Sequence, residues 1–447
     1  MVFTILGAGL SGLSCSYHIG HEQCKIFESQ KHPGGHIFSY EKNGFIWDEG
    51  PHVSFTQHDY VQNLFANSVS YDFHEFSVNV ENFFHNSWIP HPAQSNLYAI
   101  PEPLRTACLK SFLSSRKIDE TSMELSHYGE WLDKAFGEVF SRRFPYVYTK
   151  KYWTVTPELL TTDWIGNRIY YPDRNVVKNG YEKPPTESTH YIKSARYPKV
   201  GGYFSFSNIL ISNADITLDC PIQSIDLENK RIELPDGNYH NYDKLISTIP
   251  LPEFVFLTNA PQKIQNAANQ LSCTSLLLVN VTAPHPAKLS SQWFYVYDED
   301  KLSTRVSSIE LMSSNNVPIG KTGIQVEVYF SKYKPLTISK EEISKIVCKE
   351  LLEMGVIDIV ESVHTKLIPY ANIIYDHSRR KNQEIILNWL EKYGLIRESD
   401  DLEPITDWNA ITSGTIGDIA LAGRFAQWKY FWSDDCVLRG KYIANCL

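Results

Sequence analysis

The sequence lacks long apolar runs, closely spaced cysteine pairs and a surplus of basic residues. Because a bilayer-spanning helix needs about 18 or more consecutive apolar residues, we expect no integral membrane segment. The 8 cysteines are scattered without a Cys-x-x-Cys pair, which is typical of reduced thiols and predicts neither a disulfide framework nor a metal site. The net charge of −9 argues against nucleic-acid binding, because neutralising phosphates requires a broad basic face.

Internal repeats and low-complexity stretches are absent from the sequence as well. The first apolar strand begins at Val2, which leaves no room for a charged region and a cleavage site, so we expect a cytoplasmic protein. A chain of 447 residues that is 43% hydrophobic can bury more than one core, and two or three closely packed domains are expected. The oligomeric state stays open, with a homodimer as one alternative.

What the sequence does contain is a glycine-rich turn near its start. An apolar strand runs directly into Gly7, Gly9 and Gly12, the spacing of dinucleotide-binding turns. Gly7 permits the tight turn, Gly9 lets the backbone approach a pyrophosphate, and Gly12 lets the next helix pack closely with its amides facing the anion. A second strand, 24–28, ends in Glu28, where a carboxylate would accept hydrogen bonds from ribose hydroxyls.

The pattern along the chain predicts an α/β fold in which a Rossmann-like cofactor domain is discontinuous. Residues 60–145 mix short aromatic strands with helical segments at 102–113 and 123–136, which interrupts the βαβ rhythm and indicates an inserted, mostly helical substrate domain. The polar stretch 175–193 has no core pattern and is interpreted as a loop or flap. The strands at 275–281, 292–297 and 323–330 predict a β-sheet domain. The expected boundaries are 1–60, 196–250 and 376–447 for the cofactor domain, 61–195 for the helical substrate domain with its flap, and 251–375 for the β-sheet domain.

Several features together resemble the FAD-binding superfamily of amine oxidases and protoporphyrinogen oxidases. They are the glycine turn, Glu28, the pair Gly34 and Gly35, and the late strand-Gly-Arg-helix segment around Gly423. Within that superfamily, four stretches resemble the UDP-galactopyranose mutase family, particularly its longer, eukaryotic-type form. The resemblance implies FAD, active when reduced by NAD(P)H or another reductant, and a nucleotide-diphosphate sugar as substrate. It implies flavin contacts from Gly34 and Gly35.

Two of the four stretches lie in the first half of the chain. The segment 48–55 is similar to the mutase histidine loop, which implies that Gly50 and His52 lie beside the flavin; Pro51 replaces a family glycine. The segment 148–168 is similar to the mutase helix whose tryptophan lines the sugar pocket and whose arginine pairs with the diphosphate. The residues at those places are Trp153 and Arg168. A family asparagine used in nucleotide binding is Thr149 here.

The third stretch places Trp293 and Tyr295 as aromatic walls and Arg305 as a second diphosphate arginine, by the same resemblance. A family tyrosine seven residues after that arginine is Met312 here. Residues 90–96 resemble a family strand on the substrate side and assign Asn96 to the wall. The register of the tyrosine-rich stretch 370–375 is ambiguous.

The fourth stretch, 423–430, is the most specific. It resembles a family motif in which the arginine meets flavin or sugar and the tyrosine meets a phosphate, here Gly423, Arg424 and Tyr430. Asp434 and Asp435 follow in place of a family Asn-Gln pair. Acidic residues suit a helix start, whose dipole would then face the flavin.

The resemblance implies that flavin N5 forms a covalent adduct with the anomeric carbon, so that a pyranose reopens and recloses as a furanose for surface polysaccharide or glycan synthesis. Arg168 and Arg305 would clamp the leaving diphosphate, Arg424 would stabilise the reduced flavin, and His52 would sense its redox state. The alternative is a flavin oxidase acting on an amine or porphyrinogen, whose apolar or cationic substrate would not need converging arginines. A nucleotide-sugar binder without turnover is a third reading.

Overall fold

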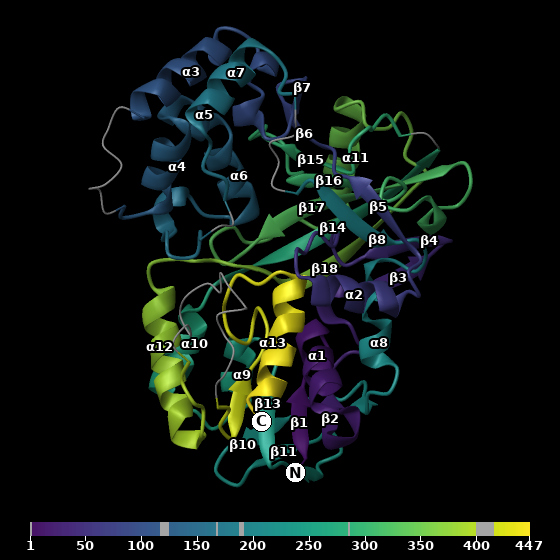
Figure 1. Cartoon of the computed structure of the whole chain (residues 1–447), viewed down its shortest axis with the longest axis vertical. Coiled ribbons are helices and arrows are strands. Elements are labelled where there is room, and N and C mark those ends of the chain that lie inside the picture. The colour runs from purple at the N-terminus through teal and green to yellow at the C-terminus, as the bar shows by residue number, and fades with distance from the viewer. Residues whose placement is uncertain (1, 117–124, 167–168, 187–191, 285–286, 399–414) are drawn as a thin grey trace.

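The computed structural model describes residues 2–116, 125–166, 169–186, 192–284, 287–398 and 415–447. The molecule has a lower lobe that carries both chain ends and an upper lobe made of a helical unit beside a large sheet (Figure 1). This mixed architecture confirms the predicted α/β fold class. None of the helices in the described ranges combines the length and apolarity needed to cross a bilayer.

The lower lobe is built on a parallel sheet with the strand order β19-β13-β1-β2-β9. Its strands come from distant parts of the chain: β1 (Phe3–Leu6), β2 (Cys24–Phe27), β9 (Ile216–Thr217), β13 (Lys244–Ser247) and β19 (Ile419–Leu421). Helices α1 (Leu10–Ile19) and α13 (Ser433–Asn445) lie side by side against it (Figure 1). The first and last segments of the chain therefore form one cofactor-type layer.

Smaller elements complete the lower lobe. A short antiparallel sheet joins β10 (Ser224–Asp226), β11 (Arg231–Glu233) and β12 (Tyr239–Asn241). Helices α9 (Leu251–Phe256), α10 (Gln262–Gln270) and α12 (Arg379–Leu390) pack along one side, while α2 (Asp59–Ser68) and α8 (Asn208–Ile211) pack near α1. The hairpin β3 (Ser39–Lys42) and β4 (Phe45–Asp48) leads toward the upper lobe.

The large sheet of the upper lobe has the order β18-β14-β17-β16-β15-β6-β7. Strands β14 (Cys273–Pro284), β17 (Lys321–Phe330), β16 (Arg305–Ser308) and β15 (Trp293–Val296) form its centre, and α11 (Lys340–Glu353) covers one face. The edge strand β18 (Ser362–Ile373) had no predicted counterpart. Strands β6 (Val80–Phe84) and β7 (Ser87–Pro90) extend the sheet at the other edge, from a region predicted to be mostly helical.

The helical unit contains α3 (Leu104–Ser115), α4 (Tyr128–Phe136), α5 (Glu138–Arg143), α6 (Pro145–Tyr152) and α7 (Arg174–Glu182). Outside it, β5 (Phe73–Ser77) pairs with β8 (Ser194–Pro198). Part of the sequence predicted as a loop or flap, 175–193, is therefore helix α7. Asp173 caps α7 by accepting hydrogen bonds from Asn175 N at 2.8 Å and Val176 N at 3.2 Å, and Val177 is buried.

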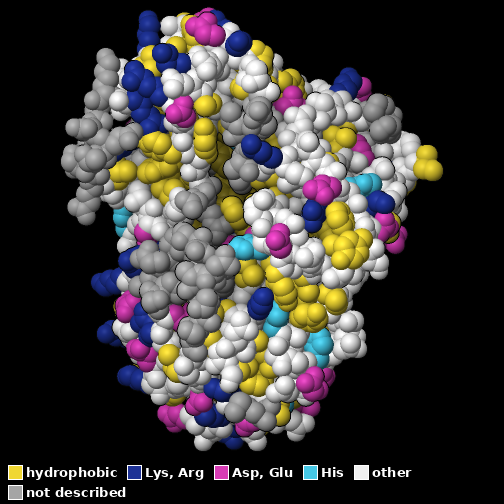
Figure 2. Space-filling view, in the orientation of Figure 1, with side chains coloured by type: hydrophobic (Ala, Val, Ile, Leu, Met, Phe, Trp, Pro, Cys, Tyr) yellow, Lys and Arg dark blue, Asp and Glu magenta, His cyan; other side chains and the backbone are white. Residues whose placement is uncertain are grey.

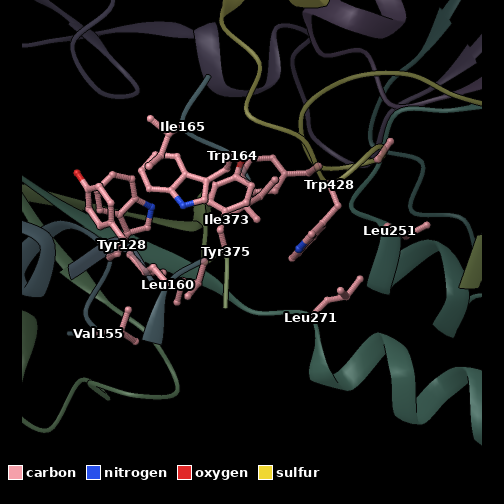
Figure 3. Close-up of a cluster of buried hydrophobic side chains, with 14 of the residues drawn as sticks. Tyr128, Val155, Leu160, Trp164, Ile165, Leu251, Leu271, Ile373, Tyr375 and Trp428 are labelled. Atoms are coloured by element: carbon pink, nitrogen blue, oxygen red, sulfur yellow. The ribbon is translucent and has the colours of Figure 1, made fainter. Parts of the chain in front are cut away.

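A single cluster of buried side chains joins the helical unit to the lower lobe. Figure 3 shows Tyr128 and Trp164 of the helical region beside Tyr375, with Leu251 of α9 and Trp428 farther along the same cluster. Trp164 and Tyr375 stack with ring centroids 5.3 Å apart. Because close-packed interiors transmit displacement, this cluster fixes the helical unit relative to the cofactor sheet.

Candidate active site

The turn between β1 and α1 has the geometry that only glycine tolerates. Gly7 has φ +96°, and a Cβ there would lie 2.5 Å from the Thr248 hydroxyl oxygen. A Cβ on Gly12 would lie 2.0 Å from the Gly7 carbonyl oxygen, so the helix can approach the strand only because this residue has no side chain. The turn is therefore built as the glycine spacing predicts.

The second glycine pair lies against this turn. Gly34 N donates to Ala8 O at 2.8 Å, and a Cβ on Gly35, whose φ is +54°, would lie 3.1 Å from the Gly9 Cα. The amides of the first turn of α1 have no acceptor within the helix, as at every helix start. The two glycine-containing segments thus form a backbone cradle without side chains beside the N-terminus of α1. Such a cradle suits a pyrophosphate.

Glu28 ends β2 beside this cradle and is 7% exposed. Its carboxylate accepts a hydrogen bond from Ala8 N at 2.7 Å and another from Gln30 N at 2.8 Å. The backbone donors hold the side chain at the glycine turn, where ribose hydroxyls of an adenosine would meet it. The cradle, the helix start and this carboxylate together fit the ADP half of FAD.

The late motif brings a cation to the other side of the cleft. Gly423 has φ +103° and faces Ser11 of α1, whose Oγ would lie 2.4 Å from a Cβ at that position. Arg424 follows; its Nη2 donates to Asn372 Oδ1 at 3.1 Å, and its guanidinium lies 4.9 Å from the Tyr430 ring centroid. In the described part of the chain, Arg424 forms no ion pair and its buried Nε has no hydrogen-bond partner.

Asn372 organises this region from β18. Its Oδ1 accepts from both Arg424 and the Tyr152 hydroxyl, the latter at 2.8 Å. Since an arginine only donates, the atom facing it must be the amide oxygen. Tyr375 lies 6.1 Å from Tyr430 between ring centroids. Asn372 and Tyr375 thus lie near Arg424 and Tyr430, whereas Tyr370 packs on Phe425.

The histidine loop reaches the same cleft. His52 Nδ1 lies 2.8 Å from Gly50 O, and the ring lies 5.3 Å from the Tyr203 ring. Desolvation by burial, together with the nearby Arg305, His36 and Arg424, lowers the pKa of His52 to about 4. The imidazole is therefore neutral at neutral pH. Because a carbonyl only accepts, Nδ1 carries the proton and Nε2 keeps a lone pair.

Arg305 is held by a buried carboxylate. Its Nε and Nη2 donate to the two oxygens of Glu327 at 2.5 Å and 2.8 Å, and Glu327 is 1% exposed. Two parallel hydrogen bonds fix the guanidinium plane and compensate its charge. Arg305, the predicted diphosphate clamp, is thus paired with a carboxylate of the protein itself.

A cavity of about 200 Å³ lies between the helical unit and the sheet. Figure 2 shows the surface hollowed in this part of the molecule, with hydrophobic side chains lining the hollow. None of the described residues that line the cavity is a lysine, arginine, aspartate or glutamate. The wall consists of aromatic rings from α4 to α6 and β15 together with a few polar groups: His91, Gln94, Tyr128, Phe136, Phe140, Phe144, Tyr148, Tyr170, Tyr295 and Tyr297.

The predicted substrate residues divide into wall and support. Tyr295 lines the cavity, with its ring 5.0 Å from His91 and 5.1 Å from Tyr148. Trp293 is buried behind it, and its Nε1 donates to the Tyr295 hydroxyl at 3.2 Å. Trp293 therefore supports the wall of this cavity, and its place beside a substrate stays a prediction.

Trp153 and Asn96 also lie away from the cavity wall. Trp153 is 6% exposed, and its ring packs 5.0 Å from Trp164 in the core cluster. Asn96 is 5% exposed, and its Nδ2 donates to Pro92 O at 3.0 Å within its own turn. Both side chains contribute to packing in this structure, because almost all of their surface contacts neighbouring residues.

The predicted acidic pair, Asp434 and Asp435, lies at the start of α13, and the two side chains differ in their contacts. Asp435 accepts a hydrogen bond from Trp432 N at 2.7 Å, which satisfies the helix start. Burial raises the pKa of Asp434, as does the neighbouring Asp435. Ser433 and Tyr203 share a hydrogen bond of 2.8 Å between their hydroxyl oxygens. Asp435 is thus a cap, and Tyr203 ties this helix start to the ring of His52.

Arg168 lies outside the described residues, so its predicted role has no structural counterpart here. Other members of the site escaped sequence reasoning. Tyr148, Tyr152 and Glu327 face the cleft or its arginines, and His36 lies close to Arg424. Period-two alternation along β17 could have placed Glu327 on the same sheet face as its partner on β16.

The chain was compared with known families and solved structures. The family model described as flavin containing amine oxidoreductase matches residues 10–382. A crystal structure of reduced UDP-galactopyranose mutase superposes with a TM-score of 0.87 at 21% identity, covering 98% of this chain and 92% of that one. A candidate protoporphyrinogen oxidase from Exiguobacterium sp. 255-15 gives 0.70 at 16%, covering 98% and 96%. A conjugated-linoleic-acid-producing fatty acid isomerase from P. acnes gives 0.62 at 13%, covering 98% and 96%. At these identities the structural likeness shows the fold.

Proposed function

The chain belongs to the flavin containing amine oxidoreductase family, with FAD as its cofactor, and from that premise we propose that it is a nucleotide-sugar mutase. The proposed reaction interconverts the pyranose and furanose forms of a nucleotide-diphosphate sugar. One observation carries the proposal: Arg424 lies among Tyr152, Tyr375 and Tyr430 without an ion pair in the described structure. An unpaired guanidinium beside hydroxyl donors suits an anionic group of the substrate or cofactor.

The same site suits a positively charged substrate poorly. Glu327 is a buried carboxylate of this cleft, and both of its oxygens are taken by Arg305. An amine would therefore meet Arg424 and a compensated ion pair in place of a carboxylate. Like-charge contact in a desolvated site costs free energy, so the charges favour the mutase over the amine oxidase.

The aromatic cavity would take the nucleotide end of the substrate. Its size and its uncharged rings suit a flat base, and Gln94 adds an amide for hydrogen bonding. Tyr295 connects this cavity with Arg305, since Trp293 to Val296 and Arg305 to Ser308 are neighbouring strands. A ligand that spans both would have its base at the rings and its diphosphate at the arginines.

When bound and reduced, FAD would supply the nucleophilic nitrogen for the anomeric carbon. The protein's own residues would prepare this chemistry. The remaining N–H groups of Arg305 would bind the diphosphate as it leaves, and Arg424 would stabilise the negative charge of the reduced flavin. Neutral His52 would offer the Nε2 lone pair as a hydrogen-bond acceptor without adding charge. The buried rings around the cleft would exclude water, which otherwise hydrolyses an activated sugar. Arg168 would be a further diphosphate ligand, in keeping with the family resemblance.

The test is turnover by the reduced holoenzyme. We would reduce the purified FAD complex with dithionite, supply UDP-, dTDP- and GDP-pyranoses, and separate the products by chromatography. A product of unchanged mass that forms only with reduced flavin supports the proposal and identifies the sugar. Oxygen consumption with an amine or a porphyrinogen, without any isomer, would contradict it. NAD(P)H in place of dithionite then tests the physiological reductant.

A further inference from the structure

Lys151 is a buried lysine at the end of α6. It is 6% exposed, whereas the adjacent Lys150 on the same helix is exposed. The Lys151 ammonium donates to Val296 O at 3.0 Å and to Asp298 O at 2.9 Å. It therefore ties the helical unit to the end of β15 through backbone carbonyls, without a direct carboxylate partner in the described structure.

Glu350 of α11 contacts the far end of the segment that joins β15 to β16. This side chain is 5% exposed and accepts hydrogen bonds from Leu302 N at 2.6 Å, Ser303 N at 3.0 Å and Ser303 Oγ at 2.5 Å. The Lys151 ammonium thus donates to backbone carbonyl oxygens, and the Glu350 carboxylate accepts from backbone amides. Residues 297–304, here called the β15–β16 loop, lie between the two charges.

The loop joins two parts of the proposed site. Tyr295 and Tyr297, at its start, line the aromatic cavity, and Arg305 follows its last residue. Tyr297 also contacts the helical unit, with its ring 5.1 Å from Phe144. A displacement of the loop would therefore move the cavity wall and the Arg305–Glu327 pair together.

We propose that Lys151 and Glu350 are positioning residues that clamp the β15–β16 loop, and that pH sets how firmly the clamp holds. The clamp itself stands on the contacts alone. Its consequence for substrate affinity rests on the proposed function.

Burial explains the pH dependence. Burial, with a smaller contribution from Lys334 after β17, lowers the pKa of Lys151 to about 7 against the opposing effects of Glu350 on α11 and of Asp298 and Asp300 in the loop. The unfolded value is 10.5, so the charge is present below neutral pH and is lost as pH rises through about 7. A neutral amine donates weaker hydrogen bonds to carbonyls and no longer balances the charge of Glu350.

The experiment is hydrogen exchange of backbone amides in the FAD-loaded protein, followed in peptides that cover 296–304. Exchange is compared between wild type, Lys151→Met and the matched control Lys150→Met at about pH 6 and about pH 8.5, with correction for intrinsic rates. We expect wild type and Lys150→Met to exchange several-fold faster at the higher pH. In Lys151→Met, the backbone amides of these peptides should exchange fast at both pH values. An unchanged exchange rate in Lys151→Met, or an undiminished pH dependence, would overturn the proposal.

Lys151→Arg keeps the test decisive if the methionine variant does not fold. Arginine stays charged throughout this range, so the loop should be protected at both pH values. Loss of protection with rising pH in this variant would also overturn the proposal. Hydrogen exchange needs no substrate, so its outcome is independent of whether the mutase activity is found. Where turnover is found, KM in Lys151→Met should rise several-fold while kcat changes less.

Discussion

At the residue scale, Arg424 is the side chain on which the proposed chemistry depends most directly. Replacing it with alanine should lower turnover about 10²- to 10³-fold, the usual cost of removing one preorganised electrostatic contact. FAD should remain bound, because Gly7, Gly12 and Glu28 lie on other elements. The measurement is a rate assay beside the visible spectrum of the purified variant.

The control for this variant is Arg231→Ala, which removes a surface arginine paired with Asp226 in the small sheet at 3.1 Å. It should leave both turnover and FAD content unchanged. Near-normal turnover in Arg424→Ala would remove this residue from the site, whereas loss of FAD would reassign it to cofactor binding.

Asn372 is the second residue whose role can be measured. Its amide oxygen is shared by Tyr152 and Arg424, so Asn372→Ala and Tyr152→Phe should disturb the same arrangement. We expect each to reduce turnover, and the double variant to lose less than the product of the two effects, with a coupling of about 1 kcal/mol. Independent effects in this double-mutant cycle would show that the shared hydrogen bonds do not act on the site.

Some residues of the candidate site could be predicted from the sequence, and others could not. Gly7 and Gly12 could be predicted because a backbone geometry demands glycine at fixed spacing. Trp153 and Trp293 carry the expected residue type at the expected spacing, yet Trp153 packs in the core cluster and Trp293 packs behind the cavity wall. Whether an aromatic ring faces a cavity or a core depends on tertiary neighbours, and the local pattern does not contain them. Glu327 was missed for the same reason, since its partner lies on a separate strand.

At the scale of elements, the helix α7 is the clearest departure from the prediction. Its polar composition suggested a loop, but a cap at Asp173 and a narrow buried side suffice to form a helix. That side includes Gly180, where a Cβ would lie 2.1 Å from the Ser95 carbonyl oxygen. The long edge strand β18 was missed because its outer residues are exposed and break the hydrophobic pattern.

The packing of α7 gives a prediction for this element. Gly180→Ala should destabilise the protein by about 1–3 kcal/mol, because the clash is with backbone that cannot rotate away. The matched change Asn179→Ala, at an exposed position of the same helix, should be neutral or slightly stabilising by helix propensity. Urea unfolding measures both. Equal stability of the two variants would mean that α7 is not packed on the turn before Asn96.

At the scale of the whole molecule, the discontinuous cofactor sheet could be predicted because a parallel sheet has strong rules of order and handedness. Strands β1, β13 and β19 pair although they begin near residues 3, 244 and 419. The contacts between lobes could not be predicted, because they depend on one aromatic cluster drawn from many segments. That cluster lets the helical unit place a cavity beside the cofactor cleft.

The stability of the whole molecule should fall as the solution is acidified from about pH 6.5 to about pH 4. Burial lowers the pKa of His36, His52 and His364 from 6.5 to about 4, so over this window the unfolded chain binds protons that the folded chain rejects. Asp48 acts in the opposite direction, since burial raises its pKa to about 6. The combined effect of the three histidines on the free energy of unfolding exceeds that of Asp48, because the pKa shifts of the four groups have a similar size.

The histidine contribution can be isolated by thermal unfolding of the holoenzyme at about pH 4.5 and about pH 7. His52→Gln removes one titrating ring and should reduce the loss of Tm on acidification, because up to about 3 kcal/mol of the pH-dependent free energy of unfolding then disappears. His377→Gln, at an exposed position after β18, should keep the full loss. If both variants lose as much Tm as wild type, the neutral state of His52 is not enforced by the fold, and its assigned role as an uncharged acceptor in the cleft would fail with it.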